Sequence, residues 1–77
     1  MNAMETEAGE LARLRMDARY HGERRDLYRA KVYGPRATSP ERMRELQRTA
    51  ERAAERLAVA EGHARDARDA RRSRAET

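Results

Sequence analysis

The second half of the chain carries a heptad repeat of small and apolar residues. From Met43 onward these residues recur at alternating intervals of three and four for four heptads. The eight positions are Met43, Leu46, Ala50, Ala53, Leu57, Ala60, Ala64 and Ala67. This spacing places all eight on one seam of an α-helix, and such a seam must be covered by another helix. The chain is therefore expected to fold as helices packed lengthwise against each other.

A clear boundary separates this helix from an earlier one. Gly34-Pro35 ends the first helix, because glycine accepts the left-handed geometry of a helix end and proline cannot continue a helix. Ser39 is a preferred N-cap residue, and Pro40 suits the first position of the next helix. The linker 34–39 has the length usual between antiparallel helices.

These signals predict one all-α domain, an antiparallel two-helix hairpin in the form of an alanine-rich coiled coil. The expected limits are a helix over about 4–33, a loop over 34–39, a second helix over about 40–72 and a frayed tail over 73–77, all within the single domain 1–77. Two capping boxes fit these limits, Asn2 with Glu5 and, as an alternative to the Ser39 cap, Thr38 with Glu41.

The loop length also predicts which residues of the two helices face each other. If the chain folds back through the loop, facing residues have numbers that add to about 74 or 75. Large side chains then meet small ones at three successive layers, which allows close packing. The predicted pairs are Leu11 with Ala64, Leu14 with Ala60, Ala18 with Leu57, Tyr28 with Leu46 and Val32 with Met43.

Two polar residues interrupt the seam of the first helix. His21 falls opposite Ala53 and Arg25 opposite Ala50, with Asp17 one turn before His21 as a hydrogen-bond partner. The residues form either a functional polar pocket or long side chains that pass over alanines and fix the register of the helices. The second interpretation needs no ligand and is the simpler one.

The chain is short of large side chains for a stable monomer. Of the 38% hydrophobic residues, 15 are alanine, and Phe, Trp and Ile are absent. Domains of 77 residues with so thin a seam usually need further association. Disorder is the competing expectation for a chain with 42% charged residues, but the net charge of +4 is low for a disordered chain.

The first helix carries a second stripe of apolar residues away from the seam. The second stripe consists of Met16, Tyr20, Leu27 and Ala30. An apolar stripe left uncovered by a two-helix unit predicts another contact, either a homodimer that forms a four-helix bundle or a separate partner helix. The alternative is ordinary surface scatter of large residues. We expect a non-enzymatic interaction or structural protein that recognises helix faces.

No pattern for catalysis, cofactor binding or metal binding occurs in the sequence. The chain has no cysteine, no glycine-rich phosphate loop and no Glu-x-x-His pair. His21 and His63 are expected nearly three turns apart, and neither Ser39 nor Ser73 has a base nearby. No segment approaches the ~20 apolar residues of a membrane span. We therefore expect a cytoplasmic protein with no enzymatic activity, cofactor or membrane association.

The basic residues support an alternative hypothesis, accessory nucleic-acid binding. Residues 13–36 hold eight basic and three acidic side chains, a local charge of +5, and four arginines recur at intervals of four in the second helix. The candidate phosphate contacts are Arg24, Arg25, Arg29, Lys31, Arg36, Arg44, Arg48, Arg52 and Arg56. Interleaved glutamates favour a solvated ion-pair surface instead. The excess of 17 arginines over one lysine is typical of high-GC codon usage in bacteria.

Overall fold

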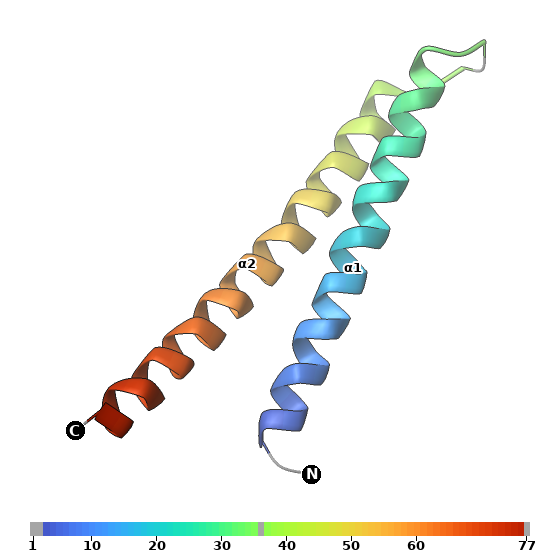
Figure 1. Cartoon of the computed structure of the whole chain (residues 1–77). Helices are drawn as coiled ribbons and strands as arrows, with labels where there is room; N and C mark the ends of the chain where they lie inside the picture. The colour runs from blue at the N-terminus through green and yellow to red at the C-terminus, as the bar shows by residue number, and fades with distance from the viewer. Residues whose placement is uncertain (1–2, 36, 77) are drawn as a thin grey trace.

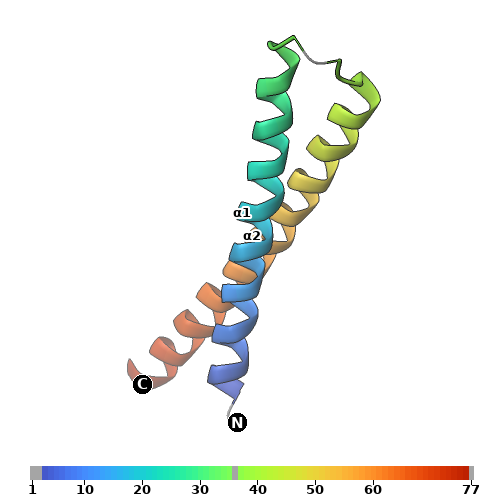
Figure 2. The same cartoon turned by 90° about the vertical axis from the view of Figure 1, so that its right-hand side faces the viewer.

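The protein is an antiparallel helical hairpin. The computed structural model describes residues 3–35 and 37–76, with side chains from residue 6 onward. Helix α1 spans Ala3–Val32 and helix α2 spans Pro40–Glu76, and the two lie side by side (Figures 1 and 2). The radius of gyration, 17.9 Å, exceeds the value of about 11 Å for a globular chain of this length. The all-α hairpin predicted from the sequence is confirmed, and it is a rod.

Helix α2 begins at the predicted cap. The backbone N–H of Arg42 donates to Ser39 Oγ at 3.2 Å, and the N–H of Met43 donates to the Ser39 carbonyl at 3.0 Å. Pro40 occupies the first helical position, where a missing N–H leaves no hydrogen bond unmade. Ser39, and not Thr38, is therefore the N-cap residue, because its side chain satisfies one of the free N–H groups of the first turn.

A tyrosine of α1 also binds this cap. The backbone N–H of Ser39 donates to Tyr28 Oη at 2.7 Å, and the Tyr28 hydroxyl lies 3.4 Å from the Ser39 carbonyl oxygen. In a capping box a glutamate of the first turn would accept from this N–H, but the residue at that position is Arg42. Tyr28 supplies the missing acceptor from the other helix, so the start of α2 is tied to the end of α1.

The end of α1 differs from the prediction. Gly34 does not adopt a left-handed conformation, since no described residue has a positive φ. The N–H groups of Tyr33 and Gly34 donate instead to the carbonyls of Ala30 and Lys31, three residues back, at 3.3 and 3.0 Å. Such bonds tighten the last turn and satisfy its carbonyls without a glycine cap. Arg36 in the loop lies outside the described residues.

Helix α2 is longer than predicted. Residues 73–76, expected to be frayed, continue the helix to Glu76. The alanines and arginines of this region are strong helix formers, which sustain a helix without tertiary contacts. Helix α1 ends at Val32, one residue before the predicted limit. Asn2, of the predicted first capping box, and Thr77 lie outside the described residues.

The core is small and lies close to the loop. Among the described side chains only Leu46, Ala50 and Ala53 are buried, with 8%, 4% and 1% of their surface exposed. All three belong to the predicted heptad seam and to the first half of α2. Alanine has the smallest side chain that keeps full helix propensity, so the two backbones approach closely here. The heptad seam therefore does form the helix–helix contact.

The helices separate toward the end that carries the termini. Figures 1 and 2 show this divergence, and the seam residues there are only half-buried. Leu14 and Ala60 line one hollow between the helices, and Leu11 and Ala64 line others. The predicted register is consistent with these neighbours, but the prediction of close packing at these layers is wrong, because alanine side chains are too short to fill the widening space.

Candidate interaction surface

The second stripe lies on the face of α1 that points away from α2. Three residues of the stripe lie two positions after a half-buried seam residue. They are Met16 after Leu14, Tyr20 after Ala18 and Leu27 after Arg25. Two residues correspond to a rotation of about 200° around an α-helix. The exposed fractions are accordingly large, 72% for Met16, 54% for Tyr20 and 67% for Leu27, and Ala30 is exposed too. The structure leaves the whole stripe uncovered.

Tyr20 is held in place by its neighbours on the same helix. The guanidinium carbon of Arg24 lies 5.6 Å from the centre of the Tyr20 ring, which is cation–π geometry. The ring of His21 meets that of Tyr20 edge to face, with centroids 5.1 Å apart. A side chain already restricted in this way loses less conformational entropy when it is buried by a partner. Tyr20 is therefore suited to act as an anchor.

A polar network joins the helices beside the stripe. Asp17 Oδ1 lies 3.3 Å from His21 Nε2, as the sequence predicted, and Asp17 Oδ2 accepts from Arg56 Nη2 of α2 at 3.2 Å. Arg56, a candidate phosphate contact in the nucleic-acid hypothesis, is thus paired with Asp17, and the sequence did not predict this pairing. Asp17 remains 37% exposed at its side chain. The network crosslinks the two helices, and this supports the register interpretation of His21.

Metal binding has no geometric support in this region. Within residues 3–35 and 37–76, no three His, Asp or Glu side chains come close enough together to hold an ion. His63 lies in the hollow at the open end, with Leu14 and Ala60, while His21 lies near Asp17 and Tyr20.

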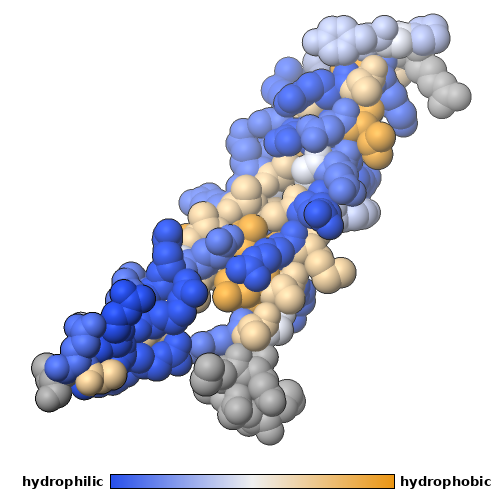
Figure 3. Space-filling model, viewed as in Figure 1, coloured by the Kyte–Doolittle hydropathy of each residue, from blue (hydrophilic) through white to orange (hydrophobic). Residues whose placement is uncertain are grey.

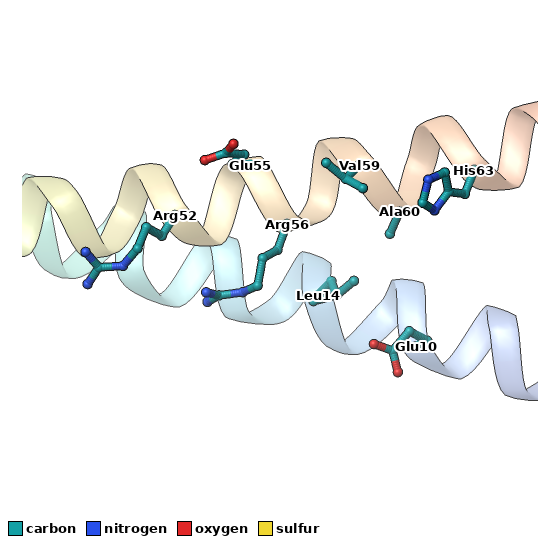
Figure 4. Close-up of a pocket in the computed structure, with 8 residues that line it drawn as sticks. All are labelled: Glu10, Leu14, Arg52, Glu55, Arg56, Val59, Ala60 and His63. Carbon is teal, nitrogen blue, oxygen red and sulfur yellow. The ribbon is translucent and has the colours of Figure 1, made fainter.

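The hollow at the open end is apolar at its base and charged at its rim. Figure 4 shows Leu14 of α1 and Ala60 of α2 directed into the space between the helices, with Val59 beside them. Glu10 and Arg56 stand at the rim. Figure 3 shows hydrophobic residues along part of the line between the two helices and hydrophilic residues on both sides. The hollow is open to solvent along its length, and it offers space for an apolar side chain.

Four of the candidate phosphate contacts already have a hydrogen-bond partner in the chain. Arg25 Nε donates to Asp26 at 3.0 Å, Arg29 Nη2 to Gln47 at 3.2 Å, Arg52 Nη2 to Thr49 at 3.4 Å and Arg56 Nη2 to Asp17 at 3.2 Å. Successive arginines of α2 four positions apart turn by about 40° around the helix, so the row Arg44, Arg48, Arg52 and Arg56 winds from one side to another.

A smaller basic cluster does occur at the loop end. Arg29, Arg44 and Arg48 surround a shallow hollow beside Val32 and Tyr33. Arg24 and Lys31 are exposed elsewhere on α1, and Arg36 lies outside the described residues. Nucleic-acid binding stays a prediction, and this loop-end cluster is the part of the structure that would carry it.

Fold and surface together define a helical hairpin with an exposed apolar face on α1. No family model, curated protein or solved structure matches the chain. Neither α1 nor α2, over the part described, contains an apolar stretch long enough for a membrane span.

Proposed function

We propose that the protein is a non-enzymatic interaction module that recognises an apolar helix face and associates with itself through the second stripe. The observation that carries this proposal is the exposure of Met16, Tyr20 and Leu27 on the face of α1 opposite α2. Full burial of one such side chain contributes about 1.5–3 kcal/mol. A cytoplasmic location, expected from a sequence with no cysteine and no segment long and apolar enough for a membrane span, belongs to the same proposal.

The surface area of the hairpin supports association. The chain exposes 6409 Å², whereas a compact monomer of 8.9 kDa exposes about 4,800 Å². A standard interface covers about 800 Å² of each partner. The hairpin can thus lose the area of a full interface and still expose as much surface as a compact protein. Among the described residues the buried core is one leucine and two alanines, and so small a core favours further association.

The mass of the protein in solution tests this proposal. We expect light scattering and sedimentation to give about twice the chain mass of 8.9 kDa at micromolar concentration. Replacement of Tyr20 and Leu27 together by glutamate places two charges in the interface and should give a weakly folded monomer, with reduced helical content by circular dichroism.

A matched control adds the same charge outside the stripe. Ala54 and Ala58 are exposed on α2, one helical turn apart. The double variant Ala54→Glu with Ala58→Glu should keep the mass of the parent protein. A parent chain that is a stable monomer over the whole concentration range would refute self-association.

A further inference from the structure

We propose that the second stripe is covered by the same stripe of a second copy, with the two α1 helices antiparallel about a two-fold axis and with the numbers of facing residues adding to 43. This inference rests on the proposed function, and it specifies the partner, the orientation and the register. The heptad frame of the stripe and the charged residues beside it favour this register over the alternatives.

The stripe has its own heptad frame. Arg13, Tyr20 and Leu27 recur at intervals of seven, and Met16, Glu23 and Ala30 occupy the second heptad position. In an antiparallel pair, residues of the first kind pack against residues of the second kind. One register satisfies every layer: Met16 faces Leu27 of the second copy, Tyr20 faces Glu23, and Arg13 faces Ala30. Each layer occurs twice because of the two-fold axis.

This register explains the polar residue that interrupts the stripe. Glu23 lies between Tyr20 and Leu27 and would be an unpaired charge in an ordinary apolar interface. Opposite Tyr20 of the second copy it can accept a hydrogen bond from the phenol hydroxyl, while the ring covers its aliphatic part. The two Tyr20–Glu23 layers lie on either side of the axis. The outer layers, Met16 with Leu27, supply the apolar contact.

The charged residues beside the stripe are complementary in the same register. In an antiparallel pair, the residues beside the stripe on one side of α1 face the residues on the same side of α1 in the second copy. On one side Arg19 faces Asp26 of the second copy, and all four side chains of these two pairs are exposed. On the other side lie the pairs Lys31 with Glu10 and Arg24 with Asp17. Each acid of these pairs also has a partner in its own chain, Arg56 for Asp17, Arg25 for Asp26 and Arg13 for Glu10, so the contacts between the copies would extend existing ion pairs.

Other arrangements bring like charges together. Shifting the antiparallel register by one heptad in one direction puts Asp26 against Asp26 and Arg24 against Arg24 at the axis. The shift in the other direction puts Arg19 against Arg19 and Asp17 against Asp17. Each of these contacts is repulsive. The register in which the numbers of facing residues add to 43 has none of these four like-charge contacts.

A parallel dimer is disfavoured for the same reason. Its central layer would place Glu23 against Glu23, and a layer ten residues away would place Arg13 against Arg13. Arg19 would also flank Arg24 of the second copy. Two buried carboxylates at one layer would have to lose a charge or separate. The antiparallel orientation is thus favoured by repulsion in the parallel dimer as much as by attraction in the antiparallel dimer.

The dimer would be a row of four helices. Because the second stripe lies about 200° around α1 from the seam, both α1 helices are in the middle and both α2 helices are outside. This order differs from the square cross-section of most four-helix bundles, in which each helix packs on two adjacent neighbours.

Charge reversal tests the register. Arg19→Glu creates two like-charge contacts in the dimer, and so does Asp26→Arg; we expect each to raise the dimer Kd about tenfold. The combination of both substitutions exchanges the charges and should restore the parent Kd to within about threefold. Arg72→Glu makes the same charge change at an exposed position of α2 and is the control. In a parallel dimer Arg19→Glu would relieve a repulsion and tighten binding, which would overturn the inference.

Disulfide trapping tests the orientation independently. The chain has no cysteine, so single cysteine variants give an unambiguous result. Met16→Cys and Leu27→Cys should form a disulfide dimer when mixed and oxidised. Neither should do so alone, because in this register two copies of either residue are about 16 Å apart along the axis. Helical content by circular dichroism checks that each variant folds.

The outcomes separate this inference from the proposed function. A parent protein that is dimeric, but whose Met16→Cys variant forms a disulfide dimer alone, refutes the antiparallel register and leaves self-association intact. A dimeric parent whose mixed variants give no disulfide refutes the register as well. A monomeric parent refutes both proposals.

Discussion

Ala53 offers the sharpest test of how the two helices meet. It is 1% exposed, the most buried side chain described, and lies where α1 and α2 pack closely. Leucine at this position adds three carbon atoms to a contact that has no room for them. Overpacking of this kind costs about 1–3 kcal/mol. A chain of 77 residues has a total stability of about 4–12 kcal/mol, so the loss is a sizeable fraction of it.

Ala54→Leu is the matched control for Ala53→Leu. The two variants have the same composition and the same change in helix propensity, but Ala54 is exposed. For a loss of about 2 kcal/mol we expect the melting temperature of Ala53→Leu to fall by about 8–16 °C, with that of Ala54→Leu near the parent value. Thermal unfolding followed by circular dichroism at one fixed protein concentration measures both. Equal melting temperatures for the two variants would show that the helices do not approach at Ala53.

Three further predictions concern the cap, the interhelical ion pair and the alternative function. Ser39→Ala removes the side chain that accepts from the first turn of α2 and should lower the free energy of unfolding by about 1 kcal/mol in urea titrations. Arg56→Gln removes the partner of Asp17, both partly exposed, and should cost less than about 1 kcal/mol, with the difference from the parent shrinking in 1 M salt. If the protein binds nucleic acid through the loop-end cluster, Arg44→Glu with Arg48→Glu should abolish binding in a fluorescence titration at ~50 mM salt, and the absence of binding by the parent would refute that function.

Those features of the fold that depend on local sequence were predicted correctly. The start of α2 at Pro40 was predictable because Ser39 and Pro40 act within one turn of the helix. The seam was predictable because heptad spacing fixes which side chains share a face. The register also followed, since loop length limits how two antiparallel helices align, and the contacts of Asp17 with Arg56 and of Arg29 with Gln47 agree with it to within two residues.

The features that the sequence predicted wrongly, or did not predict, depend on the angle between the helices and on side-chain and backbone conformation, and not only on which residues face each other. The hollow around Leu14 arises because the helices diverge, and a repeat of residue types does not report the angle between helix axes. The pairing of Arg56 with Asp17 depends on where a long side chain reaches across the interface. Gly34 was assigned a left-handed conformation from residue preference, but the last turn of α1 ended through shorter hydrogen bonds instead.

The sequence predicted the stripe but not how its members are supported. Met16, Tyr20 and Leu27 are exposed, as a stripe outside the seam must be in an isolated hairpin. The cation–π contact of Arg24 and the edge-to-face contact of His21 with Tyr20 depend on side-chain conformation and were not predicted. Whether a partner covers the stripe stays a prediction.

The contact between Tyr28 and Ser39 has a consequence for the order of folding. It closes a short loop between the helices, and the three buried residues of α2 lie in the turns of the helix that follow. Closing a short loop loses less entropy than closing a long one. Contacts between α1 and α2 therefore form first beside the loop and then successively toward the termini. Amide hydrogens next to the turn should then exchange with solvent most slowly, while those near Leu11 and Ala64 exchange through opening of the ends without unfolding of the rest.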